Sequence, residues 1–399
     1  MAHDSSTGAT AHEYGPATEL IHRGQGIGPA VTPLTTPVYE TTTFVFESAD
    51  EIRQYLTGAK GKYLYSRYEN PTVVSVEEKL AAADGAEAAV AFSSGMAASA
   101  TTLLSLLRSG DEVVCSAAIY GGTLHLLADL LANFGVVPRF VTLEELARPE
   151  EAITPKTRLL WFESPVNPTL RCVDIRRIAA ACRARGVLSV IDNTFASPMN
   201  QQPLALGVDL SMQSVTKYLN GHSDVTGGCL AGSRELVGRV NKTRRLVGTV
   251  LDPYPAYALG RGLKTLPIRI KRHNENALAV AQFLSGDRRV STVYYPGLAS
   301  HPDHQIAAAQ MIGFGGMVCF DVGGSFERAC GLFDRLHLIQ RAASLGGVES
   351  IVSLPVLTSH YGYSDEDLKR AGVTRGMLRL SVGLEDPEDL IADLDQALG

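Results

Sequence analysis

The most reactive group in the sequence is an amine that follows two hydroxyls in the segment Ser214-Val-Thr-Lys217. An apolar run from Val208 to Met212 precedes it, which predicts a strand that ends at this segment. A lysine in such a place can form a Schiff base with pyridoxal phosphate while Ser214 and Thr216 bind the phosphate. A surface lysine at a strand end has the same local sequence, so the rest of the chain must distinguish the two interpretations.

Polar side chains also follow the ends of three other predicted strands, at Tyr120, Glu163 to Asn167, and Asp192. The carboxyl ends of parallel strands meet at one edge of a sheet, where ligands gather. An acid there suits a protonated ring nitrogen, and an aromatic ring can stack on a planar cofactor. The turn around Gly95 opens a predicted helix, whose first N–H groups can bind a phosphate. Together these residues predict a pyridoxal phosphate pocket.

The elements that must position these residues alternate along the chain from about residue 73. Apolar runs predict strands at 88–92, 112–116, 137–142, 158–162 and 187–191. Segments with helical periodicity predict helices at 73–83, 95–107, 122–134 and 174–185. Continuously apolar strands predict a mostly parallel sheet with helices on both faces.

A long helical pattern over 254–283, interrupted or bent at Pro267, leads to a second, smaller α/β unit. That unit has predicted strands at 317–322 and 377–382, a helix at 325–336, and a closing helix capped by Asp386. We therefore expect a flexible tail and an extended N-terminal arm over 1–66, a large cofactor-binding domain over 67–265, and a small C-terminal domain over 266–399.

Composition limits the class of protein. The 399 residues are 45% hydrophobic and 20% charged, with a net charge of −6, which indicates a globular chain with a large core. Scattered Lys and Arg argue against nucleic acid or membrane partners. The N-terminus lacks the pattern of a signal peptide, so we expect a cytoplasmic protein with six reduced, mostly buried cysteines. His301 and His304 have metal-like spacing in a polar loop without a third ligand, so no metal is expected.

Nine motifs, in order over nearly the whole chain beyond residue 20, resemble the Cys/Met metabolism family of pyridoxal phosphate enzymes. They are Tyr65-Ser-Arg-Tyr-Glu-Asn-Pro71, Ser94-Gly-Met96, Tyr120-Gly-Gly-Thr123, Glu163-Ser-Pro-Val-Asn-Pro168, Asp192-Asn-Thr-Phe195, Ser214-Val-Thr-Lys-Tyr-Leu-Asn-Gly-His-Ser-Asp224, Arg261-Gly-Leu-Lys-Thr265, Ser344-Leu-Gly-Gly-Val-Glu-Ser350 and Arg379-Leu-Ser-Val-Gly-Leu-Glu385. The resemblance implies a fold-type-I, aminotransferase-like architecture and a homotetramer of tight dimers.

The resemblance also implies a role for each matching residue. Lys217 would be the Schiff-base lysine, Asp192 would pair with the pyridine nitrogen, and Tyr120 would stack on the ring and act as acid or base. The cofactor's other contacts would come from Ser94, Gly95, Met96, Ser214 and Thr216 at the phosphate, Tyr65 and Arg67 of the neighbouring subunit, and Asn167 at the ring hydroxyl. The substrate would be bound by Arg379, which would clamp its carboxylate, with Ser344, Asn167, Tyr65 and Glu349 near it.

The implied reaction is γ-elimination of a sulfur amino acid, cystathionine or methionine, to 2-oxobutanoate, ammonia and a thiol. The alternative is γ-replacement on an O-acylhomoserine, and a cofactor-free binding protein on the same scaffold is a third reading. Gly122 stands where methionine γ-lyases carry a cysteine, and Ser223 and Glu349 favour the cystathionine enzymes. Leu64 and Leu124, in contrast, give an apolar lining that suits an uncharged side chain. The substrate therefore stays open at this point.

Overall fold

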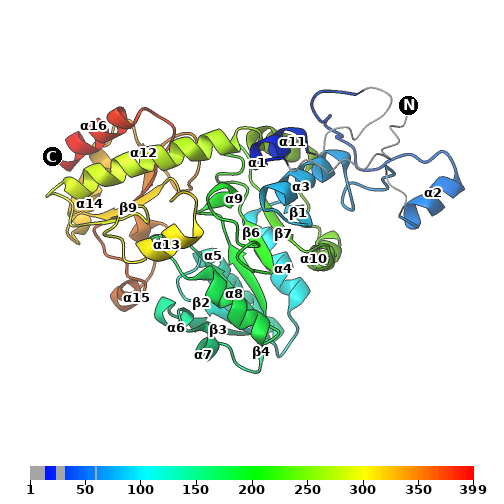
Figure 1. Cartoon of the computed structure of the whole chain (residues 1–399), viewed down its shortest axis with the longest axis horizontal. Coiled ribbons are helices and arrows are strands. Elements are labelled where there is room, and N and C mark those ends of the chain that lie inside the picture. The colour runs from blue at the N-terminus through cyan, green and yellow to red at the C-terminus, as the bar shows by residue number, and fades with distance from the viewer. Residues whose placement is uncertain (1–13, 24–31, 59–60) are drawn as a thin grey trace.

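The computed structural model describes residues 14–23, 32–58 and 61–399, so the expected flexible tail lies almost wholly outside the described residues. Two β-sheets, of seven and five strands, organise the described chain. Helices cover both sheets, and one long helix, α12 (Leu266–Gly286), runs along the top of the view in Figure 1 toward the C-terminal part of the chain. The fold is α/β, as the sequence predicted.

The larger sheet has the strand order β1-β7-β6-β5-β4-β2-β3. Neighbours from β6 to β3 pair in parallel, whereas β7 is antiparallel to both β6 and β1, so the sheet is mostly parallel. Its strands are β1 (Ala88–Phe92), β2 (Glu112–Ser116), β3 (Val137–Val141), β4 (Thr157–Glu163), β5 (Leu188–Asp192), β6 (Leu210–Gln213) and β7 (Gly228–Gly232). Strand β7 was not predicted, because its two glycines weaken the strand pattern.

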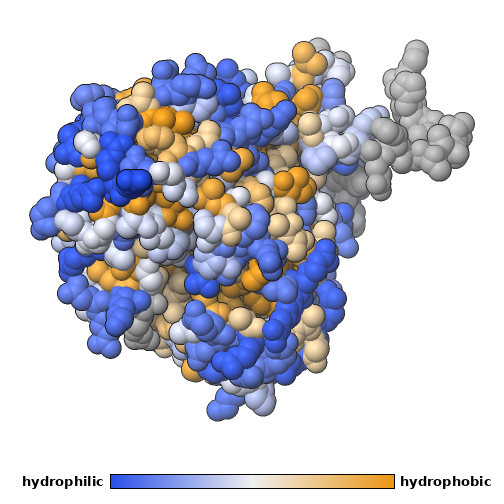
Figure 2. Space-filling model, turned by 60° about the vertical axis from the view of Figure 1, so that its left-hand side comes forward, coloured by the Kyte–Doolittle hydropathy of each residue, from blue (hydrophilic) through white to orange (hydrophobic). Residues whose placement is uncertain are grey.

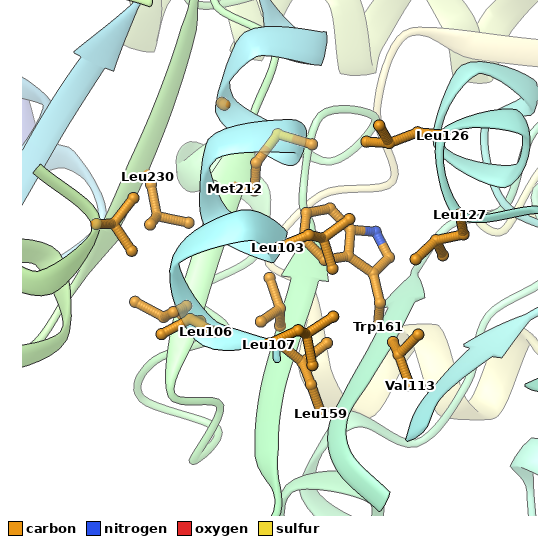
Figure 3. Packing of buried hydrophobic residues seen from close by; sticks show 14 of the residues in the cluster. Leu103, Leu106, Leu107, Val113, Leu126, Leu127, Leu159, Trp161, Met212 and Leu230 are labelled. Atoms are coloured by element: carbon orange, nitrogen blue, oxygen red, sulfur yellow. The ribbon is translucent and has the colours of Figure 1, made fainter. Parts of the chain in front are cut away.

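Side chains alternate in direction along each buried strand, so each strand contributes apolar residues to both faces of this sheet. Leu159 and Trp161 of β4 enter one apolar cluster, and Leu160 and Phe162 enter another on the opposite face. Figure 3 shows Trp161 surrounded by leucines that include Leu103 of α4. The helices on the two faces include α3 (Pro71–Ala83), α4 (Gly95–Leu106), α8 (Ile175–Ala184), α10 (Arg234–Val247) and α11 (Pro253–Leu263). All six cysteines are free and five are buried, in line with reduced core residues.

Two helix predictions need correction. The segment predicted as one helix over 122–134 is three short turns, α5 (Gly121–His125), a π-helix (Leu126–Leu130) and a 3-10 helix (Leu131–Phe134). The long helical pattern is α11 and α12, and the break lies at Lys264 and Thr265 rather than at Pro267. Pro267 lies in the first turn of α12, where backbone N–H groups have no acceptor within the helix, so its missing N–H costs no hydrogen bond.

The smaller sheet has the order β10-β11-β12-β9-β8. It packs with α12, α14 (Phe326–Arg335) and α16 (Pro387–Leu398) around one apolar cluster. Its strands are β8 (Thr292–Tyr294), β9 (Met317–Asp321), β10 (Gln340–Arg341), β11 (Ile351–Ser353) and β12 (Met377–Ser381). The shorter helices of the described chain are α1 (Pro16–His22), α6 (Leu143–Leu146), α7 (Pro149–Ala152), α9 (Ser197–Asn200), α13 (His304–Gln310) and α15 (Asp365–Arg370).

The part of the N-terminal arm that carries the helix α2 (Ala49–Leu56) projects from the body (Figure 1), whereas α1 packs against α3 with Leu20 buried. The arm is therefore not extended throughout. No residue of α2 is buried, and Val45 beside it is 95% exposed. Across the body, Figure 2 shows apolar residues interspersed with hydrophilic ones. Within the described residues, no helix combines the length and apolarity that a membrane span requires.

Candidate active site

A cavity of about 600 Å³ opens at the carboxyl ends of β4, β5 and β6, where the sequence placed its polar residues. Its wall combines the larger sheet with residues that precede or belong to the smaller sheet, such as Ser344 and Arg379. The predicted residues that line it are Ser94, Gly95, Met96, Tyr120, Asn167, Asp192, Ser214, Thr216, Lys217, Ser344 and Arg379. Side chains up to 285 residues apart in the sequence therefore face one space.

Lys217 follows β6 after a short turn, and its Nζ atom donates a 2.6 Å hydrogen bond to Oγ of Ser344. Burial, and next the positive charge of Arg379, together lower the pKa of Lys217 to about 8. An amine whose pKa lies closer to neutrality is more often unprotonated at neutral pH. It is therefore better suited to act as a nucleophile and a base.

Two carboxyl groups form the acidic end of the cavity, because Glu163 of β4 pairs in register with Asp192 of β5. Asp192 accepts hydrogen bonds from the backbone N–H and the hydroxyl of Thr194. Burial raises the pKa of Asp192 to about 6 despite these bonds. Burial, and next the charge of Asp192, raise the pKa of Glu163 well above its ordinary value. A cationic pyridine nitrogen beside Asp192 would favour the ionised form of this buried carboxylate.

At the opposite end of the cavity, where α4 begins, glycines allow the backbone segments to pack closely. Ser94 caps α4 by accepting a hydrogen bond from the N–H of Ala97. A Cβ atom on Gly228 would lie 2.3 Å from the carbonyl oxygen of Ser94, and one on Gly95 would lie 3.0 Å from Cβ of Ser214. These positions accept only glycine without rearrangement, so β7 and the loop before Lys217 pack closely against the first turn of α4. The free N–H groups of that turn and nearby hydroxyls form a cradle that suits a phosphate.

A single guanidinium occupies the side of the cavity nearest the smaller sheet. Arg379 of β12 donates from Nη1 to Oδ1 of Asn167 at 2.8 Å and from Nη2 to the carbonyl oxygen of Ser344 at 3.1 Å. Its side chain is largely buried, and its Nε atom has no acceptor within the described residues. The guanidinium of Arg379 is held in place by Asn167 and Ser344, and its Nε–H remains available as a donor. It is therefore suited to bind a carboxylate.

The other three predicted residues lie outside this cavity. Arg67 donates to the backbone carbonyl of Arg245 at 2.5 Å, and its guanidinium lies 4.7 Å from the centre of the Tyr68 ring. Tyr65 is 40% exposed. Glu349 is exposed and accepts a 3.2 Å hydrogen bond from Ser223. Roles for Tyr65 and Arg67 toward a neighbouring subunit, and for Glu349 toward a substrate, stay predictions.

Sequence reasoning missed several residues of the site. Thr194 accepts a hydrogen bond from the N–H of Ser214 at 2.9 Å and donates to Asp192, so it joins the acidic end to the lysine loop. Its position two residues after a strand-end aspartate was a usable signal. Thr358 and Ser359 also line the cavity. They lie in an irregular segment without a motif, and no sequence signal pointed to them.

The candidate metal motif has a structural role instead. His301 is buried rather than solvated, and it accepts a hydrogen bond from the N–H of Asp303. Asp303 forms an ion pair with Arg171. Within the parts of the chain that the structure describes, no group of three or more His, Cys, Asp or Glu side chains is placed to bind a metal ion.

Comparisons with known proteins agree with this geometry. The family profile described as Cys/Met metabolism PLP-dependent enzyme matches residues 17–399. The chain belongs to this family. It is 43% identical to a cystathionine γ-synthase of Mycobacterium bovis (98% of this chain, 99% of the relative) and 42% identical to an L-methionine γ-lyase of Pseudomonas putida (96% and 97%). The crystal structure of MetB from Corynebacterium glutamicum superposes with a TM-score of 0.90 at 39% identity, over 96% of this chain and 98% of that one.

Membership of the Cys/Met metabolism family settles the fold as that of a fold-type-I pyridoxal phosphate enzyme. It also settles the cofactor, and the acidic pair, the α4 cradle and the buried lysine fit that cofactor. The chain is an enzyme of the group that contains the trans-sulfuration γ-lyases and γ-synthases. Relatives with both activities match it at similar identity, so similarity alone leaves the reaction open.

Proposed function

We propose that the protein is a carbon–sulfur lyase that cleaves a sulfur amino acid by γ-elimination, giving 2-oxobutanoate, ammonia and a thiol. Both methionine and cystathionine have the Cγ–S bond that this reaction breaks. The charges of the cavity lining support methionine better.

Arg379 binds the α-carboxylate of the substrate, and Asn167 and the carbonyl of Ser344 hold its guanidinium in place. This contact turns the Cα–H bond toward Lys217, whose amine removes the α-proton. Pyridoxal phosphate, when bound, supplies an electron sink for the negative charge that develops on the substrate. Asp192 stays ionised and stabilises a proton on the ring nitrogen.

Tyr120 is suited to protonate the departing sulfur. Its backbone N–H donates to Glu163 at 2.5 Å, which fixes the turn that carries the ring, and its side chain lines the cavity. The hydroxyl of Ser344 holds the Lys217 amine near the substrate as the proton moves from the α-carbon. The proton taken from Cα and the proton given to sulfur thus pass through two separate side chains.

One observation carries the choice of elimination. Among the described residues that line the cavity, Lys217 and Arg379 are the only cationic side chains, and both have assigned tasks. Cystathionine, or the cysteine used in γ-replacement, brings a second carboxylate that would need its own cation. A carboxylate without a partner in a buried site is costly. The uncharged thioether side chain of methionine needs none.

The second candidate is γ-replacement on an O-acylhomoserine, and Gly122 supports the cystathionine enzymes in general, the γ-synthase among them. A Cβ atom at this position would lie 2.6 Å from Cε1 of Tyr120 and 2.9 Å from Sδ of Met96. The cysteine that is typical of methionine γ-lyases at this place therefore does not fit beside the Tyr120 ring as it lies here. The two candidates differ in whether a nucleophile captures the intermediate.

The deciding experiment uses purified holoenzyme and a substrate panel. Methionine, cystathionine and O-succinylhomoserine are each supplied with and without cysteine, and 2-oxobutanoate, ammonia and cystathionine are measured. We expect 2-oxobutanoate and ammonia in equal amounts from methionine without cysteine. If no sulfur amino acid yields a 2-oxo acid, the lyase proposal is wrong. Cystathionine formed faster than 2-oxobutanoate from O-succinylhomoserine and cysteine would establish the second candidate.

We further propose that the active site is completed by a neighbouring subunit, in a homotetramer built from dimers. Tyr65 at the end of the arm and Arg67 directly after it lie outside the cavity of their own chain. It also exposes large apolar side chains, with Leu34 at 84% and Val45 at 95%. Exposed apolar side chains on a projecting arm indicate a protein contact.

A further inference from the structure

A second cavity, of about 170 Å³, lies between α3, α11 and the start of the arm, and it shares no lining residue with the active-site cavity. Two helix faces with the same spacing form its walls. Thr72, Ser75, Val76 and Lys79 lie on one face of α3, and Tyr257, Gly260, Arg261 and Lys264 lie on one face at the end of α11. Thr35 and Thr36 of the arm close it.

The charged side chains that line this cavity are all cationic, although the carboxylates of Glu19 and Glu78 act on Lys79 from outside the lining. Three cationic side chains line it, Lys79, Arg261 and Lys264, and none of the described lining residues is acidic. Within the described chain, Arg261 and Lys264 have no side-chain hydrogen bond or ion pair. The three cations gather at this cavity although the chain as a whole has a net charge of −6. Cations at a helix end interact favourably with its carbonyls, but that interaction does not explain Lys79, which comes from the middle of the other helix.

Lys79 is the deepest of the three, with 2% exposure, and it donates to the backbone carbonyls of Ile21 and Arg23. Burial, followed by the nearby charge of Lys264, lowers the pKa of Lys79 to about 8. Two neighbouring ammonium groups that repel each other in a partly buried space would both be stabilised by an anion between them.

Hydroxyl groups complete the lining. Oγ1 of Thr36 lies 2.9 Å from Oγ of Ser75, so the arm and α3 are already joined at the cavity. The close approach of α3 and α11, where a Cβ on Gly260 would lie 3.1 Å from Cγ2 of Val76, keeps the walls at a fixed separation. Cations with hydroxyl donors on rigid walls suit the several acceptor oxygens of a tetrahedral anion.

We propose that this cavity is a binding site for a small tetrahedral oxyanion, such as phosphate or sulfate, separate from the cofactor site. Arg261 and Lys264 bind the anion from α11, and Lys79 binds it from α3. The bound anion joins α3, α11 and the arm. It therefore stabilises the segment that leads to Tyr65 and Arg67.

The test uses the holoenzyme, whose phosphate cradle is already filled, and inorganic phosphate as the probe in isothermal titration calorimetry. The variant Arg261→Gln/Lys264→Gln is compared with Lys271→Gln/Arg288→Gln, which makes the same change in net charge at exposed positions outside both cavities. We expect saturable binding by the wild type, at least about tenfold weaker binding by the first variant, and unchanged binding by the second.

Sulfate should displace phosphate competitively, because the two anions share the tetrahedral shape. The visible absorbance of the bound cofactor shows that each variant is folded. The proposal is overturned if the wild type shows no saturable phosphate binding, if both double variants bind equally well, or if sulfate does not compete. Neither the reaction nor its substrate enters this experiment, so its outcome is independent of the lyase proposal.

Discussion

The hydrogen bond from Nζ of Lys217 to Oγ of Ser344 joins the loop after β6 of the larger sheet to the segment before β11 of the smaller one. Ser344 has a φ of 105°, outside the region that side chains normally adopt. Such a backbone conformation costs on the order of 1 kcal/mol or more and is typical of functional sites. The strained backbone places the Ser344 hydroxyl next to the Lys217 amine. Substitutions at Ser344 therefore test whether this hydroxyl positions the amine.

Replacing Ser344 by Ala and by Gly separates its hydroxyl from its backbone. Both changes remove the acceptor of the Lys217 amine, so we expect kcat to fall by roughly tenfold in each. Glycine accepts the positive φ, so Ser344→Gly should be more stable than Ser344→Ala by about 1 kcal/mol. Steady-state rates and thermal unfolding of both proteins provide the measurement. Full activity in Ser344→Ala would show that the hydroxyl does not position the amine.

Replacing Lys217 by Ala should abolish the visible absorbance of covalently bound cofactor, because no other described amine lines the cavity. We expect the turnover rate to fall by at least about a thousandfold, since the same amine moves the α-proton. Absorption spectra after dialysis, together with single-turnover rates, measure both effects. Lys271→Ala, at an exposed position of α12, is the control and should keep the wild-type spectrum. A retained visible band in Lys217→Ala would remove the basis of the assignment.

The sequence predicted the parts of this site that depend on local pattern. Apolar runs marked β1, β2, β4 and β5, and strand-end polar residues marked Asp192 and Lys217. The contact between Arg379 and Asn167 joins residues 212 positions apart, and only the packing of the two sheets creates it. Strand β7 escaped prediction because close packing against Ser94 and Asp209 requires its glycines, and glycine weakens strand signals.

The substrate end was the least predictable part. Leu64 and Glu349 were candidates from the resemblance, yet neither lines the cavity of its own chain. Thr358 and Ser359 do line it, from a segment without regular structure. Such segments carry specificity because the strands and helices hold them in place without fixing their sequence. The face on which a strand residue lies can be predicted from the alternation of side chains along the strand. The direction of a loop side chain depends on the assembled fold and cannot be predicted in this way.

Two neighbouring glycines give a matched pair for testing how Tyr120 is held. A Cβ atom on Gly122 would lie 2.6 Å from the Tyr120 ring, whereas one on Gly121 would meet its nearest neighbour, the carbonyl oxygen of Ser359, at 3.5 Å. Gly122→Ala should therefore displace the ring and lower kcat by about a hundredfold, with the cofactor still bound. Gly121→Ala should stay within a few fold of the wild type. Equal activities of the two variants would contradict a requirement for the Tyr120 position.

Asp84 predicts a pH dependence of stability. It is fully buried at the end of α3 and accepts hydrogen bonds from Ser211 at 3.1 Å and from Gln213 at 2.8 Å. Burial raises its pKa from the ordinary 3.8 to about 7. Between these values the folded protein binds more protons than the unfolded chain, so the contribution of Asp84 to stability falls as pH rises toward 7.

The substitution Asp84→Asn removes this titration. The free energy of unfolding of the wild type minus that of the variant should therefore fall by on the order of 1 kcal/mol or more between about pH 5 and about pH 8. Urea unfolding of both proteins at each pH gives the difference, in which other titrating groups cancel. A difference that is constant with pH, or that grows with pH, would show that Asp84 is ionised throughout.

The shared active site can be tested by mixing two inactive proteins. Arg67→Ala removes a group proposed to reach the neighbour's cofactor, and Lys217→Ala removes the lysine of the chain's own site. Each variant alone should have little activity. After the subunits of both are exchanged by mild denaturation and refolding, half of the dimers are hybrids, and each hybrid has one site with neither substitution.

The mixture should therefore regain about a quarter of the wild-type activity per dimer, if pairing is random. Parallel mixing of Lys217→Ala with Asp192→Ala is the control, because both residues belong to the same chain's cavity. Every site in that mixture carries one of the two substitutions, so no activity should return. Recovery in the first mixture and none in the second would locate Arg67 across the subunit interface. Equal outcomes in both mixtures would place Arg67 in a role confined to its own chain, where it binds the carbonyl of Arg245.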